Sequence, residues 1–414
     1  MTSPGAFDRR SLLRGLGLAA AATPLAAAAA NGTVELPSWQ LSREEFRAMG
    51  LPTFFDGVPS FLQVPIALTP RDIEGADIAV LGIPWEGAMY VDNDVTVLNN
   101  KRPPNPEAIK GRSGAYLAPD YLRQWSVMMS LKSTSGRMSE HGPDFLITDY
   151  VKAVDCGNVK GTEGNVYEFI RDVTPRIREV VGSGAMPIFL GGDHTLPAFT
   201  LPEIERFHGG KTGIVWIDQH YDLFWGKDLM PTAGSALCHF YQHARSSPEN
   251  LAIIGIGGSQ NTAEWEETSR RIGCTVFTIA DVERFGMGEV VARAIEVAGR
   301  GTDNVYVSFD VDSLDVMRFP AIKAACPYLL DPDDVRRAFG RIVRECKVSG
   351  IDIACFAPPY DVKGIAAMGA IGILFEVFAH TALKKRAASA KIDASKTDPS
   401  KTGAPGTDAI GTAR

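Results

Sequence analysis

The stretch IVWIDQHYDLFW, residues 214–225, begins as a strand and ends in side chains that can bind metal ions. Residues 214–217 are all apolar, which is typical of a strand covered on both faces of a sheet. Asp218, His220 and Asp222 then follow at every second position, and alternate side chains of an extended segment point the same way. A single motif of this kind often only caps a turn, so its meaning depends on the rest of the chain.

The same kind of apolar, β-branched run recurs along the chain. With the first included, eight such runs occur, at residues 78–84, 150–155, 186–192, 213–218, 251–257, 275–281, 304–310 and 350–356. Helical segments with acidic starts and basic ends separate several of them, at residues 165–181, 288–299 and 331–347. Alternating strands and helices indicate βαβ units. We therefore expect an α/β fold of three layers (α/β/α), with a mainly parallel sheet of about eight strands between the helices.

Two other predicted strands also end in side chains that can bind metals. Residues 186–192 lead into His194, and residues 304–310 lead into Asp310 and Asp312. Because ligands of an open parallel sheet bind beyond the carboxyl ends of its strands, we expect all these side chains to meet at one edge. The complete set is His194, Asp218, His220, Asp222, Asp310 and Asp312.

This set predicts a centre of two metal ions. Four carboxylates cannot lie together without compensation, because their repulsion raises their pKa values or pushes the loops apart. Divalent cations remove that conflict, and oxygen and nitrogen donors without a thiolate suit Mn²⁺, with Ni²⁺, Co²⁺, Fe²⁺ or Zn²⁺ less favoured. Six donors exceed the need of one ion unless it is fully enclosed, whereas they suit two ions that share bridging carboxylates.

Three motifs that contain these residues resemble those of the ureohydrolase family, which includes arginases and agmatinases. They read Gly-Gly-Asp-His at 191–194, Asp-Gln-His-Tyr-Asp at 218–222 and Ser-Phe-Asp-Val-Asp-Ser-Leu-Asp at 308–315. The resemblance extends over about residues 50–382, and the early stretch IAVLGIPWEGA is most similar to agmatinase-like members. It implies a binuclear metal-dependent hydrolase that cleaves a C–N bond of a guanidino or amidine compound, with release of urea.

The resemblance also implies a role for each predicted ligand. Asp218 and Asp310 bridge the two ions. One ion is bound by His194, Asp218, Asp222 and Asp310, and the other by Asp218, His220, Asp310 and Asp312.

The same resemblance implies attack by a metal-bound hydroxide, with Asp222 passing the water's proton to the departing nitrogen. His239 lies where the family has a histidine that shuttles protons. An insertion after Asp222 makes His243 a competing candidate, and either histidine could equally be a surface or helix residue.

The chain departs from the family at Cys355, which stands where a glutamate normally holds the guanidinium. A neutral thiol cannot form that charge-assisted pair, which is worth roughly 1.5–3 kcal/mol. We therefore expect a remodelled substrate site, in which Cys355, Tyr221 and Trp225 contact the substrate together with Phe224. The alternative for Phe224 and Trp225 is that both are simply core residues.

Two other functions remain open. The missing glutamate favours an amide, formimino or lactam hydrolase on the same scaffold. A non-catalytic subunit of a mixed oligomer is disfavoured, because such a subunit would have no need to keep six ligands. Family members usually form trimers or hexamers, so the resemblance implies a homo-oligomer that acts on a small molecule.

The two ends of the chain differ in composition from the rest. Residues 1–30, with Arg9, Arg10 and an Ala-rich run too short for a confident membrane span, resemble a twin-arginine export signal. We expect a periplasmic protein without a membrane span in its mature chain, loaded with Mn²⁺ before export of the folded protein. Residues 31–384 are expected to form a single catalytic domain, and the polar residues 385–414 a disordered tail.

The remaining composition is that of an ordinary globular protein. The formal charge is 42 − 49 = −7 and the core region has no block of Lys or Arg, so nothing indicates nucleic-acid binding. The six cysteines form no CxxC pair, and we expect most of them to be small buried residues. Residues 90–110 read as a long loop that walls the site or contacts another subunit.

Overall fold

The eight predicted strands form one parallel sheet in the computed structural model, which describes residues 59–87, 114–131, 145–162, 165–226 and 229–396. The strand order is β2-β1-β3-β8-β7-β4-β5-β6, and every neighbouring pair is parallel. The strands are β1 Ile78–Ile83, β2 Ala153–Asn158, β3 Met186–Gly191, β4 Thr212–Ile217, β5 Leu251–Ile256, β6 Thr275–Thr278, β7 Asn304–Asp310 and β8 Val348–Ala354. The predicted fold class is therefore confirmed.

Helices connect these strands, as the sequence pattern predicts. The α-helices are α4 Pro70–Ile73, α5 Ala118–Ser126, α7 Val166–Gly182, α8 Leu196–His208, α9 Ala236–Tyr241, α10 Ala263–Ile272, α11 Ile279–Phe285, α12 Met287–Gly299, α13 Pro332–Glu345 and α14 Ile365–Lys396. The 3₁₀ turns are η2 Phe61–Gln63, η4 Ala115–Leu117, η5 Val127–Met129, η7 Ile147–Asp149, η8 Ala233–Ser235, η9 Pro248–Asn250, η10 Val311–Ser313 and η11 Pro358–Tyr360. The three helices expected at 165–181, 288–299 and 331–347 correspond to α7, α12 and α13.

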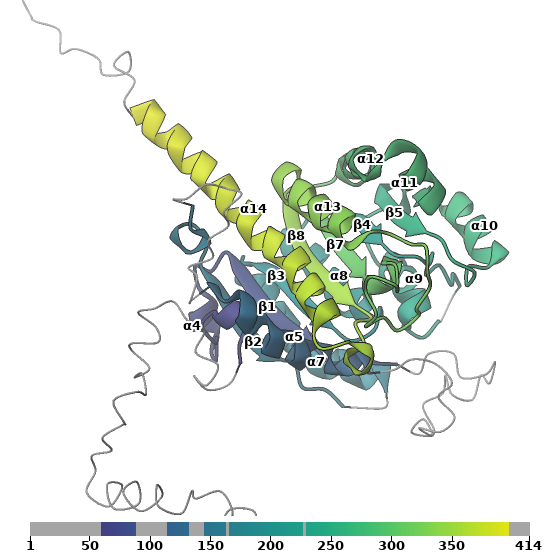
Figure 1. Ribbon diagram of the computed structural model, residues 1–414, viewed down its shortest axis with the longest axis horizontal. Helices are drawn as coiled ribbons and strands as arrows, with labels where there is room; N and C mark the ends of the chain where they lie inside the picture. The colour runs from purple at the N-terminus through teal and green to yellow at the C-terminus, as the bar shows by residue number, and fades with distance from the viewer. Residues whose placement is uncertain (1–58, 88–113, 132–144, 163–164, 227–228, 397–414) are drawn as a thin grey trace, which may run out of the picture. The chain divides into compact units, whose positions relative to one another are not determined.

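The sheet is the middle of three layers. Successive residues of β4 show this, because Val215 and Ile217 pack in one hydrophobic cluster and Ile214 and Trp216 in another. The first cluster contains side chains of α5, α12, α13 and α14, and the second contains side chains of α7, α8, α9 and α10. Figure 1 shows α13 and α14 lying across one face of the sheet. Both faces are thus covered, which explains why the strands read as continuous apolar runs.

The end of β6 differs from the prediction. The strand was expected over residues 275–281, but it stops at Thr278 and the chain continues as α11. Thr278 begins the helix because its side chain accepts a hydrogen bond from the Asp281 N–H, while the Asp281 carboxylate accepts one from the Thr278 N–H. This reciprocal capping box outweighs the β propensity of the apolar residues between them.

The predicted polar tail is also shorter than expected at its start, because α14 continues through residues 385–396. The first half of α14 is buried, and residues 384–390 are exposed. Lys, Arg and Ala are good helix formers, so the exposed part continues a helix that packing has already begun. Within the described residues, Ile365–Ala390 is the one stretch long and apolar enough to span a membrane, but it lies mostly buried inside the fold, as a core helix does.

Several predictions concern residues outside those that the structure describes. The export signal at 1–30, the loop at 90–110 and the tail beyond Lys396 are among them. All the described residues fall in one compact unit, residues 54–414.

Candidate metal centre

The six predicted ligands lie together at one edge of the sheet. β3, β8, β7 and β4 are consecutive neighbours in the sheet and run in parallel, so their carboxyl ends lie side by side. The possible ligand atoms at this edge form overlapping groups, and within each group all the atoms lie within 4.8 Å of one another. The groups are His194 with Asp218 and Asp222, Asp218 with His220 and Asp312, and Asp310 with Asp312 and Cys355.

His194 is the centre of the first group. Its Nδ1 lies 2.9 Å from Asp218 Oδ2, 3.2 Å from Asp222 Oδ2 and 3.2 Å from Asp310 Oδ2. Its Nε2 lies 2.9 Å from the hydroxyl oxygen of Ser308. The ring is fully buried and stacks on Trp216, with 3.9 Å between ring centroids.

The contacts of Ser308 determine which nitrogen of His194 carries a proton. The Ser308 hydroxyl donates to the Asp352 carboxylate at 2.9 Å, so its oxygen is free to accept a hydrogen bond from His194 Nε2–H. Nδ1 then points at the three carboxylate oxygens, and a positive charge, either a proton or a cation, must lie between them. A metal-binding histidine is held in this way, with its second nitrogen donating into a hydrogen-bonded acid.

His220 occupies the second group. Its Nδ1 lies 3.4 Å from Asp218 Oδ1 and 3.1 Å from Asp312 Oδ2, and its Nε2 lies 3.3 Å from Gln260 Oε1. Asp218 joins the two groups, because one of its carboxylate oxygens faces each histidine. Asp312 Oδ1 is buried and has no hydrogen-bond partner among the described residues. This oxygen is therefore available to bind a cation.

Local turns hold these carboxylates in place. The Asp218 carboxylate accepts hydrogen bonds from the His220 N–H at 2.6 Å and from the Trp216 indole at 2.9 Å. The Asp310 carboxylate accepts one from the Asp312 N–H at 2.8 Å. In both cases an aspartate binds the backbone two residues ahead, which explains the spacing of the motifs.

The electrostatics of the cluster are those of an acidic site that needs cations. Burial and the charge of Asp218 raise the pKa of Asp222 to about 7. Burial also raises the pKa of Asp312 to about 6, and burial together with the Asp312 and Asp218 charges raises that of Asp310 well above its usual range. Burial opposes protonation of His194, but the surrounding carboxylates outweigh it and raise its pKa well above the usual value. Divalent ions would replace these protons, so the donor set fits two metal ions.

Comparison with known proteins agrees with this geometry. A family model described as Arginase family matches residues 76–379. The chain belongs to the arginase family. As a member of this family, it is a hydrolase that acts on C–N bonds other than peptide bonds, in guanidino or amidine compounds.

The named relatives and solved structures that match this chain share modest sequence identity with it. A guanidinobutyrase from Pseudomonas aeruginosa is 26% identical over 332 residues, which are 78% of this chain and 92% of that protein. The proclavaminate amidino hydrolase from Streptomyces clavuligerus has the same fold, with a TM-score of 0.66 at 22% identity over 80% of this chain and 98% of its own. So does a formiminoglutamase from Trypanosoma cruzi with Mn²⁺, with a TM-score of 0.63 at 20% identity over 78% of this chain and 98% of its own.

Cys355 lies closer to the candidate metal centre than the sequence suggests. It was expected to contact substrate, and the structure places its buried thiol beside Asp310 and Asp312. Its backbone has a φ of 61°, and its N–H donates to the Gly192 carbonyl at 2.7 Å.

A buried ionic group next to Cys355 is not predicted from the sequence. Lys323 is 6% exposed, and its ammonium lies 2.9 Å from Glu86 Oε1 and 3.8 Å from Asp193 Oδ2. Glu86 accepts the Gly114 N–H, and Asp193 accepts the Gly87 N–H. The only local signal is a charged residue inside each of two apolar stretches, FPAIKAAC and GIPWEGA. The sequence also does not predict the hydrogen bond from Ser308 to Asp352, which supports the ring of His194.

The two candidate proton-shuttle histidines lie on or beside α9. His239 is half-buried, and its Nδ1 has no hydrogen-bond partner among the described residues. Burial, and to a smaller extent the neighbouring His243, lower the pKa of His239. His243 is exposed. Within the described residues, no hydrogen bond or ion pair connects either histidine to the six ligands, so this role stays a prediction.

The aromatic residues after the ligand strand have the contacts of core residues. Tyr221 is buried in the hydrophobic cluster with α7 to α10, and Phe224 and Trp225 pack against that cluster. Phe224 packs edge-on against Trp265, and Trp225 stacks on Tyr241. Their predicted contact with substrate stays a prediction.

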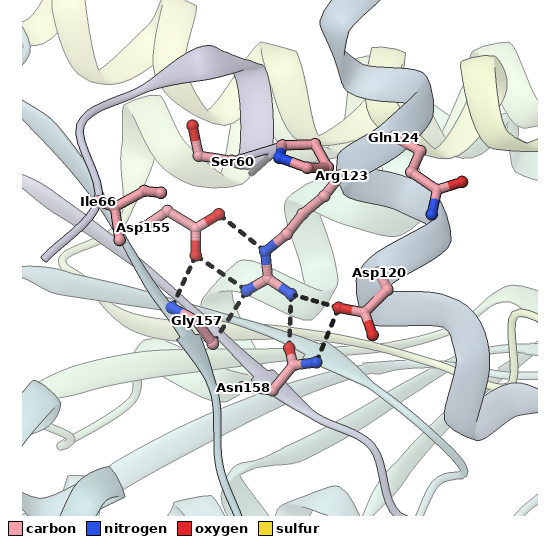
Figure 2. Close-up of a pocket in the computed structure, with 9 residues that line it drawn as sticks. Ser60, Ile66, Asp120, Arg123, Gln124, Asp155, Gly157 and Asn158 are labelled. Atoms are coloured by element: carbon pink, nitrogen blue, oxygen red, sulfur yellow. Dashed lines mark hydrogen bonds and ion pairs between the residues drawn. The ribbon is translucent and has the colours of Figure 1, made fainter. Parts of the chain in front are cut away.

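A surface pocket near the end of β2 has different properties. Figure 2 shows the Arg123 guanidinium pointing toward Asp155, Gly157 and Asn158. Arg123 donates to Asp155 through Nε at 2.8 Å and through Nη2 at 2.9 Å, and the same Nη2 also donates to the Gly157 carbonyl. The cation of this pocket is therefore already satisfied, and its role is to hold the end of β2.

Proposed function

We propose that the chain is an agmatinase-like hydrolase with two metal ions that cleaves a C–N bond of a guanidino or amidine compound and releases urea from a guanidino substrate. The observation that carries the proposal is the arrangement of Asp218, whose two carboxylate oxygens face His194 and His220 separately. A carboxylate with one oxygen toward each of two histidine-containing groups is placed to bridge two ions.

Each ion would take four ligands from the cluster. The two sets are His194, Asp218, Asp222 and Asp310, and Asp218, His220, Asp310 and Asp312. These donors suit Mn²⁺ with Ni²⁺ as the alternative, and the Trypanosoma cruzi relative was solved with Mn²⁺. When bound, such ions supply a water of lowered pKa as the nucleophile at neutral pH.

In the proposed reaction, the side chains of this protein orient the metal ligands and transfer protons. Ser308 and Asp352 hold the His194 ring so that Nδ1 faces the site. Asp222, whose carboxylate lies against the same Nδ1, accepts the proton of the attacking water and passes it to the departing nitrogen. His239, whose Nδ1 has no hydrogen-bond partner in the part of the chain that the structure describes, relays protons between the site and solvent.

A second candidate function rests on Cys355. Burial and the Asp310 charge raise the pKa of this thiol well above its usual value, so on its own it is a neutral group. A neutral group gives a guanidinium no ionic partner, which favours an amide or formimino substrate. A non-catalytic subunit is the least favoured function, because all six ligands lie in one cluster.

A substrate panel separates these functions. The purified protein, loaded with Mn²⁺ or with Ni²⁺, would be incubated with guanidino acids, agmatine, guanidine, formimino compounds and simple amides. Urea release supports the proposed function, and ammonia or an amine without urea supports the second. If no compound on the panel is hydrolysed, both candidate functions are contradicted. The Asp218→Asn variant, which loses the bridge, is the control for contaminating activity.

Location and assembly are part of the proposal. We propose that residues 1–30 are removed on export to the periplasm and that the mature chains form a homo-oligomer, a trimer or a hexamer. Mass spectrometry of the protein from a periplasmic extract should give an N-terminus near residue 31, and light scattering should give the mass of three or six chains. A full-length monomer in the cytoplasm would contradict both.

A further inference from the structure

The Cys355 thiol lies on the Asp310–Asp312 side of the metal centre. Its sulfur and one carboxylate oxygen from each aspartate lie within 4.8 Å of one another. A metal–sulfur bond of about 2.3 Å and metal–oxygen bonds of about 2.0–2.2 Å are compatible with donor atoms at this spacing.

The backbone fixes where this sulfur points. Cys355 follows the last residue of β8, and its φ of 61° is unusual for a residue with a side chain. Its N–H donates to the Gly192 carbonyl at 2.7 Å, and its carbonyl accepts the Lys323 N–H at 3.1 Å. The thiol is thus directed into the site by contacts on both sides of the residue.

Two buried groups near Cys355 indicate that both a metal cation and a negatively charged ligand can be accommodated at this position. Asp312 is 2% exposed, and its Oδ1 has no hydrogen-bond partner among the described residues. The Lys323 ammonium is buried near Cys355, forms an ion pair with Glu86 and donates no well-formed hydrogen bond within the described residues.

We propose that Cys355 is a thiolate ligand of the metal ion on the Asp310–Asp312 side. On binding, the S–H bond breaks, the proton passes to solvent, and the sulfur forms a bond to the ion without any change of oxidation state. The inference rests on the proposed binuclear function and changes the metal expected at one of its two positions. A thiolate beside imidazole and carboxylate favours Co²⁺, Ni²⁺, Fe²⁺ or Zn²⁺ over Mn²⁺ at that position.

Absorption spectroscopy of the cobalt-loaded full-length protein tests this inference. A thiolate bound to Co²⁺ gives an intense charge-transfer band in the near ultraviolet, whereas oxygen and nitrogen ligands do not. We expect the band in the wild-type protein and its loss in Cys355→Ser and Cys355→Ala. We also expect Co²⁺ affinity relative to Mn²⁺ to fall on the order of tenfold or more in these variants.

Cys346→Ser is the matched control. Cys346 is also buried, and Lys384 donates to its carbonyl at 2.8 Å, but it belongs to none of the metal-ligand groups. The band should therefore persist in Cys346→Ser. Absence of the band in cobalt-loaded wild-type protein, or its persistence in both Cys355 variants, would overturn the inference whether or not the variants fold well.

The cobalt spectrum tests the thiolate ligand and the substrate panel tests the proposed function, so either proposal can be refuted without the other. Urea release without a cobalt–thiolate band leaves the proposed function standing and refutes the thiolate ligand. A band without hydrolysis of any substrate supports the ligand and refutes the proposed function. Wild-type protein that binds no cobalt refutes the ligand directly.

Discussion

At the scale of single residues, His194 shows how hydrogen bonds on one side of a ring orient a proposed metal ligand. Its Nε2 is held by Ser308, which in turn donates to Asp352, and Asp352 accepts a further hydrogen bond from the Tyr306 hydroxyl at 2.8 Å. Burial raises the pKa of Asp352, although its hydrogen bonds oppose that rise. The chain of contacts leaves Nδ1 facing the three aspartates, where the proposed ion would lie.

Removal of the Ser308 hydroxyl should therefore weaken metal binding without removing a ligand. We expect Ser308→Ala to lower metal affinity by about 10–100-fold, the usual cost of losing a partner behind a ligand. Titration with a metal-sensitive dye measures this change. Ser349→Ala is the control, because Ser349 is buried on β8 but its hydroxyl lies 3.3 Å from the Val305 carbonyl instead. Equal affinities in the two variants would contradict the proposed role of Ser308.

The clustering of the six candidate ligands can be predicted from the sequence, whereas the hydrogen-bonding groups behind them cannot. The alternation in residues 218–222 is a local signal, because an extended segment places alternate side chains on one side. The contact between Ser308 and Asp352 joins two strands that meet only in the folded sheet. Lys323 likewise reaches Glu86 only through tertiary structure, and no local pattern marks it as buried.

At the scale of elements, the end of β3 illustrates how close packing positions the site. A Cβ on Gly192 would lie 1.6 Å from the Trp85 carbonyl oxygen, so only glycine lets the two chain segments approach. The Gly192 N–H also donates to the Ile83 carbonyl at 3.1 Å. This contact fixes the turn that carries His194, two residues further on.

Gly192→Ala should therefore cost both stability and activity. The added methyl group meets backbone and cannot be relieved by a side-chain rotation, so we expect a loss of at least about 1–3 kcal/mol in the free energy of unfolding. Denaturant unfolding of the metal-free protein measures it. Gly288→Ala on α12 is the control, because a Cβ there meets nothing within 4 Å. If Gly192→Ala is as stable as Gly288→Ala, the close approach of the two segments is wrong.

Two differences between the predicted and the observed elements have local causes. An apolar run predicts where β6 starts, but the capping box of Thr278 and Asp281 decides where it stops. For α14, polar composition suggests a disordered tail, but a helix that is already packed continues into good helix formers up to Lys396. Period and composition predict the existence of an element better than its ends.

At the scale of the whole molecule, the buried acids and histidines couple stability to pH. Asp222 has a pKa of about 7 in the fold against an ordinary value of 3.8, so it stabilises the metal-free fold at low pH and loses that contribution as the pH rises from about 4 to 7. The raised pKa values of His194 and His220 act in the same direction, since their contribution is lost as the pH rises through the folded values. Metal ions compete with these protons, so metal binding strengthens as the pH rises.

The increase in Tm on metal saturation should thus grow between about pH 5 and pH 8. Thermal unfolding with and without excess metal, at several pH values, gives this difference and cancels the titration of groups outside the site. Asp222→Asn should make the dependence on pH shallower, because it removes one of the competing protons. A metal-induced increase that is constant with pH would contradict the assignment of these groups to the ion site.

Metal content measures the central claim most directly. Protein saturated with Mn²⁺ or Co²⁺, freed of unbound metal by gel filtration and analysed by plasma mass spectrometry, should contain two ions per chain. The Asp218→Asn variant should contain fewer than one, because both ions lose a shared ligand. One ion or none in the wild-type protein, or two ions in Asp218→Asn, would contradict a binuclear centre bridged by Asp218.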